Sequence, residues 1–372
     1  MAHENDYDES CVEDTGLGSY SYMCTRRWPE MPHDAPQSID EAVARIDQMY
    51  ESGIPFFTKD AIRSAFEQCQ QEPASGKKIY LPGLDGAIVE FDTWTGESRP
   101  GTSMDGDEVK LDRLLLAPSL RYECRASLKH SLWWGSHVDC PPFCSLLLAH
   151  PSISMRSGTK ELYEPRPRPV RADVAKAFEG HAQKWRESEM CLKLEQILTK
   201  AAAAHEITKV VGLALGTISY MDNEYPRSAV QHALLLTLRD WLTAKGGRAD
   251  QDVPCFAQDP IYKSMDKAIL REHGVEVVND PRAWLEIDDT SIVFSCAPDV
   301  PVKEIVADIA RPAVVIWEQV DHEDADQKGG ESRTDPSSPR VRAMMEGYAM
   351  FDFDADDTHF CNTVVYVRRC RE

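Results

Sequence analysis

The stretch Lys209-Val-Val-Gly-Leu-Ala-Leu-Gly-Thr-Ile-Ser219 decides the fold class of this chain. Its short apolar run, Val210 to Leu215, ends at a glycine and is followed by hydroxyl residues, which is typical of a buried strand that meets a loop. Further along, Ser228 to Leu242 has the length and composition of an apolar helix, and Gly246-Gly247 ends it. A strand, a loop and a helix in this order are the beginning of a βαβ unit.

The same order then repeats toward the C-terminus. The further predicted elements are strand Val253 to Ala257, helix Lys263 to Glu272, strand Val275 to Val278, strand Ser291 to Ser295, helix Val302 to Ile309 and strand Ala313 to Trp317. Because crossovers between parallel strands are right-handed, this repetition predicts an α/β fold with a Rossmann-like, doubly wound, mostly parallel sheet. Such sheets bind ligands at the carboxyl ends of their strands, where the strand order reverses.

A helical and hairpin elaboration precedes this core. Ser38-Ile-Asp-Glu41 resembles a capping box, Lys59 to Gln70 forms a second helix, Lys78 to Phe91 alternates like a hairpin, and Ser98 to Asp107 has the composition of a loop. One long helix, from about Ala172 to Ala204, should open the core. We therefore predict a disordered acidic tail (1–37), the N-terminal elaboration (38–171), the core (172–320), and an acidic insert with a C-terminal edge strand at Thr363 to Arg368 (321–372).

Composition limits the classes of partner. The net charge of −21 argues against DNA, and no apolar run is long enough to cross a membrane, so we expect a cytoplasmic protein without a membrane partner. The 11 cysteines are scattered and should be reduced thiols. A spacing of His137, Cys140, Cys144 and His150 is looser than a zinc knuckle and contains two prolines, so we expect no metal site and no cofactor.

Two stretches run basic despite the acidic total. Lys110 to Lys129 and Arg156 to Arg171 each hold five Lys or Arg against two acids. A solvated face is the common explanation of such stretches, and a surface for a polyanion is the alternative.

Candidate site residues follow the first strand and begin the helix after it. The amide of Gly216 could cradle an anion, and Ser219 is a hydroxyl suited to a nucleophile or a substrate anchor, or only to completing a turn. His232, near the start of the helix, could transfer protons or simply pack under the loop.

Carboxylates follow three other strands. Asp259 comes after the second strand, with Tyr262 close by; Asp299 shares a stiff, proline-rich loop with Cys296; and Glu318 follows the last strand. Three acids at the mouth of one sheet would suit a cationic substrate, because a guanidinium group pairs bidentately with carboxylates.

Several motifs resemble, in the same order, the SRR-like (sensitivity to red light reduced-like) domain family in its fungal form. They are Glu51-Ser-Gly-Ile-Pro-Phe-Phe57, the helix with Trp185, Gly212 to Gly216, Gln231-His-Ala233, Ala257-Gln-Asp-Pro-Ile-Tyr262, Asn279-Asp-Pro281 with Ile287-Asp288, and Ala297-Pro-Asp-Val-Pro-Val-Lys-Glu-Ile305. The resemblance spans roughly residues 40–320. Plant and animal members have a Pro-His-Cys-Pro-like turn where this chain has Ser295-Cys-Ala-Pro298.

Certain fungal proteins of this resemblance are arginine-containing cyclodipeptide synthases of secondary metabolism, which make a cyclo-Arg-Xaa diketopiperazine. The resemblance implies arginyl-tRNA and a second aminoacyl-tRNA as partners. We would then assign catalysis to Ser219, His232 and Tyr262, and substrate binding to Gly216, Asp259, Cys296, Asp299 and Glu318. The residues assigned to tRNA binding are Arg156, Lys160, Arg166, Arg168 and Arg171.

Two other functions stay open. Plant, yeast and animal relatives are linked to light and clock signalling and to haem metabolism without an established reaction, and Cys140-Pro141 is a dipeptide that can ligate haem iron. A methyltransferase-like or nucleotide-binding enzyme could use the same sheet.

Overall fold

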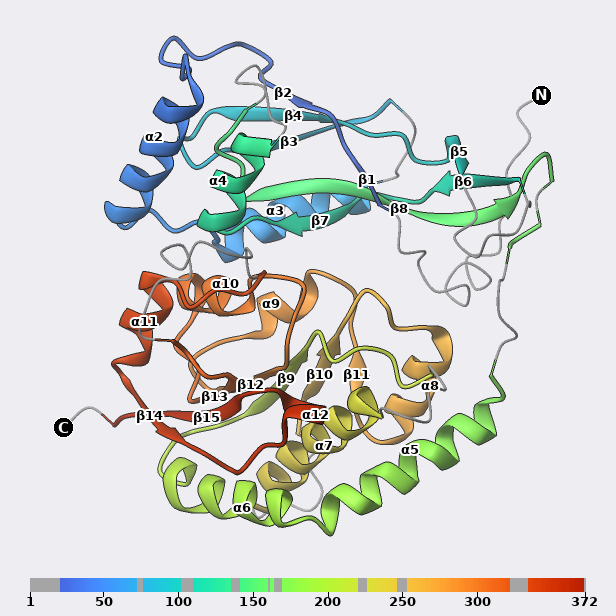
Figure 1. Cartoon of the computed structure of the whole chain (residues 1–372), viewed down its shortest axis with the longest axis vertical. Coiled ribbons are helices and arrows are strands. Elements are labelled where there is room, and N and C mark those ends of the chain that lie inside the picture. Colours follow the sequence, from blue (N-terminus) through green and yellow to red (C-terminus); the bar gives the residue numbers. More distant parts are fainter. Residues whose placement is uncertain are drawn as a thin grey trace.

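The computed structural model of the chain describes residues 21–71, 76–101, 110–134, 141–159, 161–163, 169–219, 226–245, 253–321 and 334–370. It is a mixed α/β protein in which an N-terminal half is stacked on a C-terminal half built around one large sheet (Figure 1). No helix within these residues is long and apolar enough to span a bilayer.

The large sheet has seven strands in the order β11-β10-β9-β12-β13-β15-β14. Its strands are β9 (Lys209–Leu213), β10 (Cys255–Gln258), β11 (Glu276–Val277), β12 (Ser291–Ser295), β13 (Val314–Glu318), β14 (Tyr348–Phe351) and β15 (Thr363–Arg368). The strands from β9 to β13 pair in parallel, whereas β15 is antiparallel to both of its neighbours. The predicted α/β class and the five predicted strands are confirmed, and their bounds shift by only a few residues.

The C-terminal strand is an exception to the predicted arrangement. β15 was expected at the edge of the sheet, but it lies between β13 and β14. β13 pairs with one side of β15 and the shorter β14 with the other, so β14 takes the edge of the sheet.

Helices cover both faces of this sheet. They are α5 (Arg171–Arg186), α6 (Glu189–Ile197) with the π-turn η1 (Leu198–Ala202), α7 (Arg227–Lys245), α8 (Ser264–Glu272), α9 (Arg282–Glu286), α10 (Val302–Ile309), α11 (Pro339–Met345) and α12 (Asp357–Phe360). Buried side chains of α5 to α8 pack on one face, and those of α9 to α11 pack on the other, toward the N-terminal half (Figure 1). The strands alternate accordingly: Val211 belongs to one core and Val210 to the other.

The prediction of a single long helix from Ala172 to Ala204 is wrong in one respect. The segment is divided into α5, α6 and η1, because Ser188 accepts a hydrogen bond from the amide of Cys191 and caps a new helix.

The described residues of the N-terminal half form two small antiparallel sheets and three helices. The helices are α2 (Ile39–Glu51), α3 (Lys59–Gln70) and α4 (Arg125–Trp134). One sheet has the order β2-β4-β3, from β2 (Arg26–Arg27), β3 (Lys78–Pro82) and β4 (Ile88–Asp92). The other joins β1 (Ser21–Met23), β5 (Ser98–Gly101), β6 (Leu111–Leu115), β7 (Ser119–Tyr122) and β8 (Leu146–Arg156), with β8 at its centre.

Local predictions in this half are mostly confirmed. The Ser38 hydroxyl accepts the Glu41 amide at 3.2 Å, and the hairpin from Lys78 is present. The predicted loop at Ser98 instead begins with β5, because Ser98 to Gly101 pair with β6. Disorder through residue 37 is also wrong for residues 21–37, since β1 and β2 pair with strands from far along the chain.

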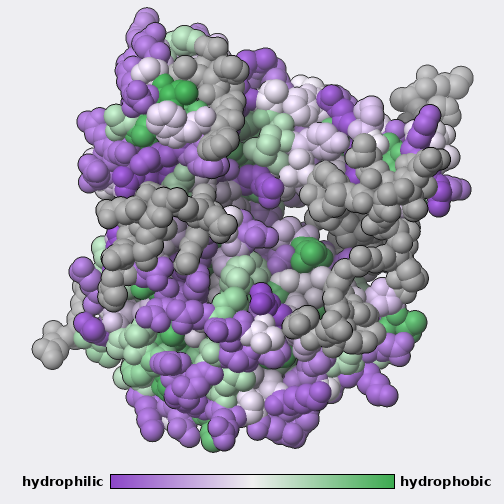
Figure 2. Space-filling view, viewed as in Figure 1, coloured by the Kyte–Doolittle hydropathy of each residue, from purple (hydrophilic) through white to green (hydrophobic). Residues whose placement is uncertain are grey.

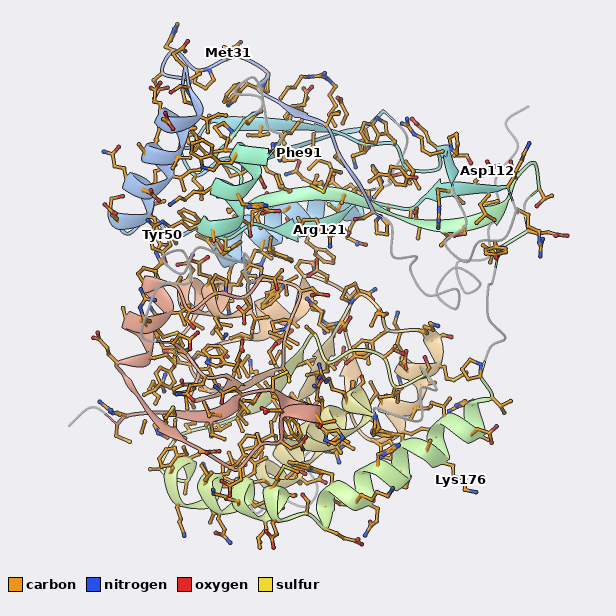
Figure 3. All side chains as sticks on the ribbon, in the orientation of Figure 1. Met31, Tyr50, Phe91, Asp112, Arg121 and Lys176 are labelled. Carbon is orange, nitrogen blue, oxygen red and sulfur yellow. The ribbon has the colours of Figure 1, made fainter. Side chains whose placement is uncertain are left out.

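The two halves share a hydrophobic core. Buried residues of α2, α3, β3 and β4 belong to the same cluster as those of α10 and α11. Polar contacts reinforce this interface: Asp308 accepts the amides of Phe56 and Phe57 at 2.7 and 3.0 Å, and the Arg340 guanidinium lies 4.0 Å from the Tyr50 ring centroid. In Figure 3, Arg121 on β7 lies on the side of the N-terminal half that faces the large sheet.

Candidate functional site

A cavity of about 660 Å³ lies at the carboxyl ends of β9, β10, β11 and β12. The loops after these strands form its floor, the first turns of α7 and part of α5 form one wall, and Ser119 to Tyr122 of β7 form another. The space-filling surface is hollowed between the two halves (Figure 2). The cavity therefore lies where the sequence places the binding surface, and the N-terminal half contributes to its wall.

Asp259 joins the loops after β9 and β10. Its Oδ2 accepts the Gly216 amide at 2.8 Å and its Oδ1 accepts the Ile261 amide at 3.0 Å. Burial raises the pKa of the Asp259 carboxyl, while these two amides act in the opposite direction. Gly216 itself has φ +72°, the left-handed region that favours glycine. The amide that was predicted to cradle an anion is thus already bonded to a carboxylate.

Ser219 does not line the cavity. It is buried, and its amide donates to Asp266 Oδ1 at 2.8 Å while its hydroxyl lies 3.2 Å from Asp266 Oδ2. Asp266 is fully buried and also accepts the Thr217 hydroxyl and the Lys263 amide, each at 2.8 Å. No local signal in the sequence points to Asp266, which fixes the turn after β9 to the start of α8. The hydroxyl of Ser219 is engaged in holding that turn.

His232 and Tyr262 form a buried pair beneath the cavity, and neither lines it. The His232 Nδ1 donates to the Ser228 carbonyl oxygen at 2.7 Å, so Nε2 accepts the Tyr262 hydroxyl, also at 2.7 Å. Burial lowers the pKa of His232 to about 4. The imidazole is therefore neutral, and the pair links α7 to the loop before α8.

Cys296 and Asp299 both line the cavity from the loop after β12. Burial raises the pKa of the Cys296 thiol to about 12, so it stays protonated at neutral pH, which disfavours it as a nucleophile. Asp299 is exposed at the cavity mouth and offers a solvated carboxylate.

Glu318 does not lie with Asp259 and Asp299. The prediction that three carboxylates, one after each of three strands, gather at one mouth of the sheet is therefore wrong for Glu318. Its Oε2 lies 3.6 Å from Nζ of Lys303, whose ammonium is also 3.5 Å from Asp335 Oδ2. Lys303 is only 1% exposed, and a buried ammonium group needs carboxylate partners to offset the loss of its hydration. The ammonium of α10 holds Glu318 in a separate charged cluster.

A third carboxylate of the cavity, Asp280, was not assigned to the site from the sequence. Its Oδ1 accepts three hydrogen bonds, from the Tyr122 hydroxyl at 2.8 Å, Gln258 Nε2 at 2.8 Å and Trp284 Nε1 at 3.2 Å. Burial raises the pKa of the Asp280 carboxyl to about 6, against the opposing effect of these donors. The signal was visible in Asn279-Asp-Pro281 at the end of a predicted strand, but nothing local reveals its donors.

Cationic side chains share the cavity. Arg121 lines it from β7 and Arg227 from the first residue of α7. His181 lines it from α5, but burial lowers the pKa of its imidazole and disfavours the charged form. Arg121 donates to the Ser21 hydroxyl at 3.2 Å, and Arg227 donates to the Thr358 carbonyl oxygen at 2.9 Å. The cavity therefore presents charges of both signs.

Two of the residues assigned to tRNA binding are described, and Lys160, Arg166 and Arg168 lie outside the described residues. Arg156, at the end of β8, lies 4.0 Å from Glu161, and Arg171, at the start of α5, forms an ion pair with Glu272. Both side chains are about half exposed, at 52% and 53%.

The looser metal and haem motifs are only partly described, because His137 and Cys140 lie outside the described residues. His150 has both ring nitrogens engaged: Nε2 accepts the Trp94 amide at 2.9 Å and Nδ1 donates to the Leu116 carbonyl oxygen at 2.7 Å. Within the described part of the chain, no group of three or more His, Cys, Asp or Glu side chains could hold a metal ion.

Residues 190–366 match the family model of the SRR1 domain. This range contains β9 to β14, most of β15 and the three carboxylates of the cavity, whereas Tyr122 and the rest of the N-terminal wall precede it. The match supports the SRR-like domain family for this part of the chain. No curated protein matches the chain.

Proposed function

We propose that this chain, whose residues 190–366 match the SRR1 domain, is an aminoacyl-tRNA-dependent cyclodipeptide synthase that takes an arginyl group into the cavity. The observation that carries the proposal is the presence of Asp259, Asp280 and Asp299 around one cavity. A guanidinium or ammonium group pairs with carboxylates, and each charge-assisted hydrogen bond contributes roughly 1.5 to 3 kcal/mol.

The size of the cavity supports a substrate of this class. Its volume of about 660 Å³ falls inside the range of about 300 to 1,000 Å³ that is typical of small-molecule sites. Apolar side chains such as Phe178 and Trp284 line it beside the acids, which suits an aminoacyl group with an aliphatic stem.

The reaction would need positioning more than redox chemistry. The amino group of the second aminoacyl ester attacks the arginyl ester carbonyl, a C–N bond forms, and the C–O bond to the tRNA ribose breaks. Repetition with the arginyl amino group closes the six-membered ring and releases the second ribose. Holding both esters in one site makes each attack effectively unimolecular.

In this proposal the exposed guanidinium groups of Arg156 and Arg171 bind the tRNA backbone. Phosphate contacts are carried by Lys and Arg, and their strength falls steeply as salt rises. The acidic total charge of −21 opposes RNA binding by the rest of the surface, so the proposal places binding on these local basic groups.

A second candidate is a nucleoside-dependent, methyltransferase-like enzyme. The order of the parallel strands, β11-β10-β9-β12-β13, supports it, because the chain order reverses between β9 and β12 and ligands of parallel sheets bind at such a reversal. Asp259 follows the second strand, where an acid can accept ribose hydroxyls. Protection of the cavity by a nucleoside alone, without tRNA, would favour this candidate.

The deciding experiment incubates the purified protein with tRNA, cognate synthetases, ATP, labelled arginine and the other amino acids, followed by mass spectrometry. A cyclo-Arg-Xaa product that ribonuclease abolishes is the expected result and names the second substrate. No product despite charged arginyl-tRNA would overturn the proposal and leave the nucleoside-dependent and regulatory alternatives.

A further inference from the structure

We propose that Asp280 is the catalytic residue that carries the proton from the attacking amine to the leaving ribose oxygen, and that Tyr122 is the residue that positions it. This inference rests on the proposed function and deepens it. It assigns to the cavity a proton carrier that differs from His232 and Tyr262, the pair that the sequence indicates.

The hydrogen bonds of Asp280 leave one oxygen for a ligand. All three donors, from Tyr122, Gln258 and Trp284, are directed at Oδ1. No residue in the described part of the chain donates to Oδ2, and Asp280 lines the cavity with partial exposure. Oδ2 is therefore the oxygen that can accept a proton from a bound amine.

The donors themselves are fixed by their surroundings. Gln258 Oε1 accepts the Ala283 amide at 2.8 Å, so its NH₂ group must face Asp280. Tyr122 and Trp284 are 8% and 2% exposed. Rigid groups from β7, β10 and α9 thus hold the carboxylate in one orientation, which general acid–base catalysis requires.

The electrostatic surroundings suit a proton carrier. The titratable and charged groups that face Asp280 are Tyr122 and Arg121 from β7 and Cys69 from α3. Burial raises the pKa values of Tyr122 and Cys69, so both are neutral at pH 7, and Arg121 favours the ionised carboxylate. With its pKa raised to about 6, Asp280 can both accept and release a proton near neutral pH.

The other candidates in or near the cavity are less suited. The pKa of His232 is lowered to about 4 and the ring lies behind the cavity wall, and the pKa of Cys296 is raised to about 12. Each oxygen of Asp259 already accepts a backbone amide.

The proton balance closes at each bond-forming step. The amine nitrogen forms the C–N bond and releases a proton to Oδ2 of Asp280, the C–O bond to ribose breaks, and the protonated carboxyl returns that proton to the ribose oxygen. The carboxylate is regenerated, so no co-reactant is consumed. The same cycle serves both amide bonds.

Asp280→Asn provides the first test, because the amide oxygen can still accept from the three donors but cannot carry a proton. We expect product formation to fall by about 100-fold or more. Glu276→Gln, on β11 and outside the cavity, is the matched control and should keep full activity. Activity of Asp280→Asn within a few-fold of wild type would overturn the inference.

Tyr122→Phe separates positioning from general stability. Loss of one donor to Oδ1 should raise the pKa of Asp280, so the acidic limb of the pH–rate profile should move to higher pH while kcat at high pH is largely retained. A profile that drops uniformly at every pH would show a merely structural role and contradict the positioning assignment.

A readout without catalysis distinguishes the two proposals. The Trp284 indole donates to Asp280, so its fluorescence should titrate near pH 6 in wild type, lose this step in Asp280→Asn and Trp284→Phe, and shift upward in Tyr122→Phe. No diketopiperazine from wild type, with this titration present, would overturn the proposed function and with it the proton transfer. If wild type forms the product but shows no such titration, only the assignment of the proton carrier to Asp280 is overturned, and the proposed function stands.

Discussion

The Tyr122 hydroxyl donates to Asp280 Oδ1 at 2.8 Å across 158 residues of sequence. Tyr122 belongs to the N-terminal half and precedes residues 190–366, whereas Asp280 lies in the loop after β11 within that range. The cavity is thus completed by a part of the chain outside the match to the SRR1 domain.

Asp280 should make the folding stability of the protein fall as pH rises. Its pKa is about 6 in the folded protein against about 3.9 unfolded, so the neutral carboxyl is favoured by folding and its contribution is lost as pH rises from 4 through 6. This difference between the folded and unfolded pKa corresponds to roughly 3 kcal/mol. Urea unfolding of wild type and Asp280→Asn between pH 4 and 8 measures it; parallel curves for the two proteins would contradict the prediction.

His232 should have the opposite dependence. Its pKa falls to about 4 on folding from about 6.5, so the stability that its neutral form contributes is present above pH 6.5 and is lost as pH falls toward 4, by roughly 3 kcal/mol. His232→Gln should lower stability at pH 7 yet remove this part of the pH dependence. Chemical denaturation at pH 5 and 7.5 checks the difference, and an unchanged slope in the variant would exclude a neutral buried imidazole.

Asp266 should matter for stability much more than Ser219. Asp266→Ala removes the acceptor of the Lys263 amide and of the Thr217 hydroxyl, and leaves the Ser219 amide only its longer bond to Thr217 Oγ1 at 3.1 Å. Each group left unsatisfied costs about 1 to 3 kcal/mol. Ser219→Ala removes one hydroxyl and should cost about 1 kcal/mol. We further expect Ser219→Ala to retain product formation. A stable but inactive Ser219→Ala protein would restore this serine as the nucleophile.

Gly216→Ala should be more destabilising than Gly86→Ala. Both glycines have positive φ, +72° and +81°, which costs about 1 kcal/mol or more for alanine. Only at Gly216 does a new Cβ also come within 3.0 Å of the Ser228 hydroxyl oxygen, whereas at Gly86 nothing lies within 4 Å. Thermal unfolding of the two variants isolates this contact, and equal shifts in Tm would show that the loop relaxes freely.

Cys296 should resist alkylation. Its thiol is 4% exposed and its pKa is raised to about 12, so iodoacetamide at pH 8 should modify the exposed Cys370 long before Cys296. Peptide mass spectrometry over time gives the order. Early modification of Cys296 would indicate a reactive thiol in the cavity.

The regular elements of the C-terminal half could be predicted because their signals are local. Apolar runs such as Ser291 to Ser295, and the amphipathic spacing of Val302 to Ile309, have the bounds in the structure that they have in the sequence. The errors arose where a partner decides the outcome. Thr363 to Arg368 alternates like an edge strand, but β14 pairs with its outer side, and β1 is ordered by β8.

The candidate site was predictable only in its location. Parallel strands bring their carboxyl ends to one edge, so the loops after β9, β10 and β12 had to meet there. The environment of each side chain was not predictable: Ser219 is held by Asp266, Glu318 is drawn to Lys303, and Asp280 receives its donors from three different elements.

The sequence by itself thus determined the α/β class, the order of strands and helices, and the edge of the sheet at which acids gather, because periodicity and turn chemistry depend on near neighbours. Only the tertiary structure decided that Asp280 faces the cavity with a raised pKa and that Glu318 pairs with Lys303 instead. Hydrogen bonds, burial and ion pairs depend on groups far apart in the sequence, such as Tyr122 and Asp280, and only the packing of the two halves brings them together.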